Sequence, residues 1–118
     1  MPTTDEIATQ PLHTVAVELL VRINAAHAAV ETWPRAFADA DVAQVRLTLP
    51  AVVALSAFLE GHSQEAISII GTIALEVWSG SDFYVEAGQS FVAGDLASAR
   101  TKWESGNAAW AHASVPAA

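Results

Sequence analysis

Hydrophobic residues recur along much of this chain at steps of three and four, the spacing that places them on one face of an α-helix. The first such stripe consists of Leu12, Val15, Leu19, Ile23 and Ala26. Pro11 suits the first turn of a helix, and Pro34 disfavours a helical conformation at the residue before it. The pattern therefore predicts a first helix over residues 11–33 and a short connection over residues 34–40.

The next segment, residues 42–49, has a mixed pattern. Val45, Leu47 and Leu49 alternate with polar residues, as they would in a strand. Asp41, just before the segment, is a favourable helix N-cap because its carboxylate can accept a hydrogen bond from a free backbone amide. We interpret the segment as helix, since a single strand would have no partner elsewhere in the chain.

Proline, glycine and serine delimit the two helices expected next. Pro50 should open a helix over residues 51–60. Gly61 stands where a residue with left-handed backbone angles commonly ends a helix. Ser63 is then the expected N-cap of a helix over residues 64–78.

A second set of breaks divides the rest of the chain. The sequence Ser-Gly-Ser at residues 79–81 predicts a loop, and Asp82 after it is the expected N-cap of a helix over residues 83–93. Gly94 predicts the next turn, and Asp95 should cap a last helix over residues 96–112.

These elements predict an all-α fold. About six short helices joined by short loops should form sequential antiparallel hairpins. The length of 118 residues allows one domain with one core. We expect a single helical domain over residues 11–112, a flexible N-terminal arm over residues 1–10 and a frayed tail over residues 113–118.

The second half of the chain resembles itself at an offset of 33 residues, which aligns the pairs Val52/Val85, Phe58/Phe91, Gly61/Gly94, Ala66/Ala99 and Ile70/Trp103. Each copy has a helix, a glycine turn and a second helix with a small residue followed by a large one. Residues 50–110 thereby resemble the tetratricopeptide repeat, which has a similar period and plan. The resemblance implies a degenerate stack of helical hairpins. These residues lack the family's early tryptophan and closing proline, and residues 11–49 do not fit the repeat.

The composition favours a contact surface for another molecule. Hydrophobic residues make up 53% of the chain and charged residues only 15%, below the usual share of about a quarter. So short a chain leaves much of its surface in water, so we expect part of that surface to be apolar and covered by a protein partner or a second copy. The formal charge of −8 argues against nucleic-acid binding, which needs a field that attracts phosphate.

The chain contains no feature that predicts export or a membrane span. Cysteine is absent, which excludes disulfides and thiolate chemistry. The first residues lack the basic and apolar regions of a signal peptide. The longest apolar run, residues 52–59, is too short to cross a bilayer. We therefore expect a cytoplasmic protein.

The residues that could perform chemistry form no recognisable motif. His27 and Glu31 share a helix face, and His62 and Glu65 lie three residues apart, but a metal site needs three or four ligands. No serine elbow or phosphate-binding glycine loop is present. We predict no catalytic, cofactor-binding or metal-binding residues, and the sequence favours a protein that is not an enzyme.

The aromatic residues are the predicted partner-binding set, because tryptophan and tyrosine are enriched in interface hot spots. This set consists of Trp78, Phe83, Tyr84, Trp103 and Trp110. The sequence thus predicts a protein–protein interaction or assembly module with an apolar, aromatic helical face. Two alternatives remain open: a structural component of a larger viral or compartment particle, and a small helical enzyme or carrier with a hydrophobic pocket.

Overall fold

The protein consists of helices and short turns. The computed structural model describes the backbone of residues 4–113 and the side chains of residues 13–113. The helices are α1 (Thr4–Glu31), α2 (Trp33–Ala38), α3 (Val42–Gly61), α4 (Ser63–Ile70), α5 (Ile73–Val92) and α6 (Leu96–His112). The described residues contain no strand, so the predicted all-α class is confirmed, as is helix over residues 42–49.

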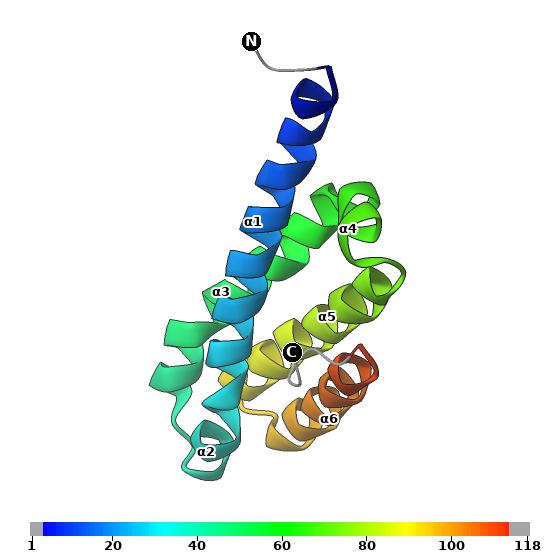
Figure 1. The fold of residues 1–118 in the computed structure, drawn as a ribbon. Helices are drawn as coiled ribbons and strands as arrows, with labels where there is room; N and C mark the ends of the chain where they lie inside the picture. Colours follow the sequence, from blue (N-terminus) through cyan, green and yellow to red (C-terminus); the bar gives the residue numbers. More distant parts are fainter. Residues whose placement is uncertain (1–3, 114–118) are drawn as a thin grey trace.

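The four long helices pack side by side in chain order (Figure 1). α3 packs against both α1 and α5, and α6 packs mainly against α5, while its Trp110 ring also lies beside His27 of α1. Successive long helices run in opposite directions, and the molecule is elongated, with extents of 56 × 25 × 22 Å. The short α4 covers one end, against α1 and α5.

The core lies where the facing sides of these helices meet. Its largest fully buried side chains are Trp33, Trp110, Tyr84, Leu19, Leu55, Leu59, Val45, Val52 and Val77. The buried members of α3 recur at steps of three, four and seven, which is the helical period. This explains the mixed pattern of residues 42–49: Val45 points into the core, whereas Leu47 points into solvent.

Two predicted breaks are absent. Pro50 lies inside α3 instead of opening a new helix. It is on the exposed side, where no neighbouring helix has to accommodate its ring. Residues 79–81 lie inside α5 and not in a loop, and Gly80 and Ser81 are buried there. The Ser81 hydroxyl donates to the Val77 carbonyl oxygen at 2.7 Å, so its polar group is satisfied within the helix.

Gly71 makes a break that the sequence pattern did not indicate. The predicted helix over residues 64–78 is divided there into α4 and the start of α5. Gly71 has φ +79 and Gly94 has φ +92, so both adopt left-handed angles. Gly61, by contrast, is the last residue of α3 and does not have a positive φ. The two aligned hairpins thus differ in shape, and the tetratricopeptide resemblance stays a prediction.

The helix ends confirm two of the predicted caps. Asp41 accepts from the Gln44 amide at 3.1 Å, and Asp95 accepts from the Ser98 amide at 3.0 Å. Asp82 is not a cap, since it lies within α5, where its carboxylate accepts from the Ser56 hydroxyl of α3. Ser63 is the first residue of α4, and the N-cap is His62, without a side-chain cap bond.

The chain ends differ partly from the expected domain limits. α1 begins at Thr4, before the predicted start at Pro11, and α2 occupies most of the connection expected over residues 34–40. The flexibility of residues 1–10 stays a prediction. The predicted tail over residues 113–118 lies outside the described residues except for Ala113, which is buried.

Candidate interaction surface

Two of the five residues in the predicted aromatic set are buried. Tyr84 is 2% exposed and Trp110 1% exposed. Their rings meet edge to face, with centroids 4.8 Å apart, and the Trp110 Nε1 atom donates to the Val77 carbonyl oxygen at 3.1 Å. Because both rings are enclosed and both polar atoms are paired, these residues join α5 to α6.

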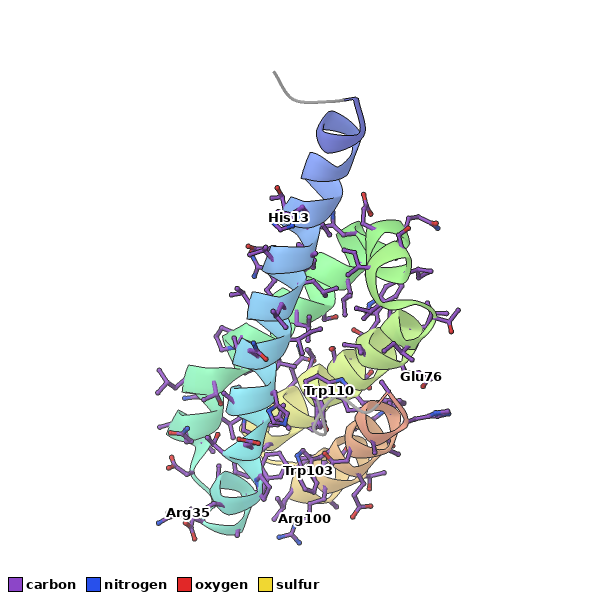
Figure 2. All side chains as sticks on the ribbon, in the orientation of Figure 1. His13, Arg35, Glu76, Arg100, Trp103 and Trp110 are labelled. Carbon is purple, nitrogen blue, oxygen red and sulfur yellow. The ribbon has the colours of Figure 1, made fainter. Side chains whose placement is uncertain are left out.

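The other three members of the set are half-buried. Trp78 and Trp103 pack against the core, and the buried Trp103 Nε1 atom has no hydrogen-bond partner. The Lys102 Nζ atom lies 5.8 Å from the centroid of the Phe83 ring, a cation–π contact. Tyr84, Trp103 and Trp110 line one cavity in the region between α6 and α1. Figure 2 labels Trp103 and Trp110 on α6.

A cavity of about 300 Å³ adjoins this aromatic cluster, lined by His27, Val30, Glu31, Pro34, Tyr84, Trp103, Asn107 and Trp110. Its polar groups bind mainly one another: His27 Nε2 lies 3.4 Å from a Glu31 oxygen, and the Tyr84 hydroxyl donates to Asn107 Oδ1 at 2.5 Å. Burial raises the pKa of the Tyr84 phenol above its ordinary value. At neutral pH the phenol therefore holds its proton, and it is unsuited to act as a general base.

Aliphatic side chains, not aromatic ones, make up the exposed apolar surface. On α1 and α3 they are Val17, Leu20, Val21, Leu47 and Val53, and at the start of α5 they are Ile73 and Leu75. Leu47 is the most exposed of them, at 75%. The sequence did contain a signal for it, since Leu47 is the residue that made residues 42–49 resemble a strand.

The outer face of α3 carries a groove lined mainly by apolar side chains. This shallow groove has a volume of about 440 Å³ and is lined by Arg46, Leu49, Pro50, Val53, Ala54, Ala57 and Val92. Val92 of α5 borders one side, and Arg22 of α1 adjoins Ala54 and Ala57 at a neighbouring depression. We call residues 46, 50, 53, 57 and 60 of α3 the α3 outer face, and all five are exposed.

Charge is confined to the two ends of the α3 outer face. Arg46 is the only charged residue between Asp41 and Glu60. Both Arg46 and Glu60 are exposed, and neither belongs to the ion pairs found among the described residues. An apolar strip with unpaired charges of opposite sign at its ends is therefore open to solvent.

Neither metal binding nor a membrane span gains firm support. No group of three or more histidine and acidic side chains that could hold a metal occurs among the residues with described side chains. α3 is long and apolar enough to cross a membrane by length and composition, because Pro50 does not end it. One such helix is weak evidence, since core helices of soluble proteins also meet this test.

The chain matches no protein-family model, no curated protein and no solved structure. The interaction role, the cytoplasmic location and the absence of nucleic-acid binding therefore remain predictions drawn from the residues themselves.

Proposed function

We propose that this protein is an interaction or assembly module that binds a protein partner through the α3 outer face. The observation that carries the proposal is the exposure of apolar side chains along the α3 outer face, above all Val53, in a groove lined mainly by apolar residues. Full burial of one such side chain contributes about 1.5–3 kcal/mol, so a partner that covers a few of them gains useful binding energy.

The distribution of charge supports the same role. The chain carries a formal charge of −8, yet no acidic residue lies between positions 42 and 59. A partner that approaches α3 therefore meets little charge that must be desolvated, and desolvated unpaired charges are costly. Interfaces depleted of charge at their centre are typical of protein–protein contacts.

The aromatic residues have a different part in this proposal from the one that their composition predicted. Tyr84 and Trp110 have almost no exposed surface to offer a partner. They stabilise the α5–α6 pair, which in turn packs α5 against α3. The binding surface is aliphatic, and the aromatic cluster supports the helices behind it.

An aspartate introduced into the α3 outer face tests the proposal. Val53→Asp should abolish association with little effect on folding, because position 53 is exposed at 41%. Ala97→Asp, on the exposed side of α6, is the matched control with the same added charge. Native mass spectrometry and light scattering over a concentration series measure association, and circular dichroism verifies the fold. Two results together would refute the proposal: a monomeric wild-type protein, and no protein partner whose binding Val53→Asp abolishes.

A further inference from the structure

We infer that the partner is a second copy of this chain. The α3 helices of the two copies pack antiparallel, and the two-fold axis of the dimer passes between their Val53 residues. This inference rests on the proposed function of the α3 outer face and names its occupant. Three residues of α3 carry it: Arg46, Val53 and Glu60, which follow one another at intervals of seven.

The spacing makes this face complementary to itself. Seven residues are nearly two helical turns, so Arg46, Val53 and Glu60 form one stripe, with its ends about 21 Å apart. In an antiparallel pair centred on Val53, Arg46 lies opposite Glu60 of the partner subunit, and Glu60 lies opposite Arg46 of the partner subunit. A two-fold contact requires such reciprocity, because both subunits use the same patch.

The charges at the two ends are available for this pairing. Arg22, His27, Arg35 and Lys102 each lie within 4.0 Å of an acidic side chain of their own chain. Arg46 has no such neighbour among the described residues, and neither does Glu60. Both side chains are exposed and long enough to reach across helices packed 8–10 Å apart, a usual interaxial distance.

The residues between the charges favour close approach. Pro50, Val53 and Ala57 are compact and uncharged, so they present a smooth surface to an identical helix. Two copies that each carry −8 repel one another, but the α3 outer face holds one arginine and one glutamate and so adds no net charge to the contact. Two paired helices bury less than the roughly 1,600 Å² of a standard interface, so we expect a weak dimer that depends on concentration.

Charge exchange tests the pairing directly. R46E places two carboxylates opposite each other at both ends of the pair, and E60R does the same with two guanidinium groups. Each variant alone should raise the dimer dissociation constant roughly tenfold. An equimolar mixture of R46E and E60R should form a heterodimer, because all its end contacts are again of opposite sign. The double variant R46E/E60R should dimerise as the wild type does.

The controls separate this inference from the proposed function. Sedimentation equilibrium measures each constant, native mass spectrometry distinguishes the heterodimer by mass, and thermal melting shows that each variant folds. In one outcome, Val53→Asp dissociates the dimer while R46E and E60R leave its dissociation constant unchanged. That outcome would overturn the antiparallel pairing but keep the proposal that the α3 outer face binds a partner. A wild-type chain that is monomeric but binds another protein, or neutral phosphatidylcholine vesicles, through Val53 would overturn self-association.

Discussion

The indole of Trp110 lies directly on the backbone of Gly80. A Cβ atom at position 80 would come within 2.6 Å of the Trp110 Nε1 atom and closer still to Cδ1. A reciprocal contact lies nearby, where a Cβ at Gly106 of α6 would be 2.8 Å from the Tyr84 ring of α5. Each helix thus offers a glycine to a large ring of the other, which lets α5 and α6 pack closely.

Gly80→Ala should therefore destabilise the protein by about 1–3 kcal/mol, because Trp110 is enclosed and cannot move aside without cost. Gly61→Ala is the matched control: nothing lies within 4 Å of a Cβ there, and the residue is helical. The control should leave stability unchanged or raise it by up to about 1 kcal/mol. Urea denaturation followed by circular dichroism measures both. Equal losses in the two variants would contradict the packing role of Gly80.

This contact also shows why the sequence suggested a loop at residues 79–81. Serine and glycine are frequent in loops, so a local pattern assigns Ser-Gly-Ser to a break. Here the small residues are needed because Trp110 approaches from 30 positions further along the chain. A contact between distant residues leaves no trace in local periodicity. The caps at Asp41 and Asp95 were predictable because their partners are only three residues away.

The buried indole of Trp33 provides a second test. Its Nε1 atom donates to the Thr48 hydroxyl of α3 at 2.8 Å, and Trp33 has no exposed surface. Thr48→Val keeps the shape but leaves this donor unpaired, which should cost about 1–3 kcal/mol. Thr48→Ser retains the hydroxyl and should lose clearly less. A Val variant as stable as the Ser variant in urea denaturation would show that the bond contributes nothing.

The two kinds of aspartate in the helices predict contrasting results. Asp95 caps α6 through the Ser98 amide, so Asp95→Ala should lower the free energy of unfolding by about 1 kcal/mol. Asp82 also follows a segment that contains glycine, but it lies inside α5, where its carboxylate accepts from the Ser56 hydroxyl at an exposed position. Asp82→Ala removes no cap, so it should cost less. Thermal melting of both variants compares the two losses of stability. A larger loss for Asp82→Ala than for Asp95→Ala would contradict the placement of residues 79–82 within α5.

The candidate binding face was only half predictable. The low share of charged residues indicated an exposed apolar surface, but the sequence pointed to aromatic residues as its members. The structure buries Tyr84 and Trp110 between helices, and it exposes Leu47 and Val53. Hydrophobicity alone does not reveal which side of a helix lacks a neighbour when both sides are apolar, as they are in α3.

Tyr84 predicts a loss of stability in alkaline solution. Burial raises the pKa of its phenol above the ordinary value of 10.0, whereas the phenol of the unfolded chain ionises near that value. Below about pH 10 both states hold the proton, and the full stability is present. Above it the unfolded state loses its proton first, so the free energy of unfolding falls as pH rises toward the pKa of the folded state.

Tyr84→Phe should remove this alkaline decline, since it keeps the ring but not the ionisable group. It also loses the hydrogen bond to Asn107, so its stability at neutral pH should be lower by about 1 kcal/mol. The chain has one tyrosine, so the ultraviolet absorbance of phenolate reports this residue alone. Urea denaturation from neutral to alkaline pH gives the difference in the free energy of unfolding between the two proteins. Two results would show that Tyr84 is not enclosed as described. One is a difference in unfolding free energy that stays constant above pH 10, and the other is a phenol that titrates at its ordinary pKa in the folded chain.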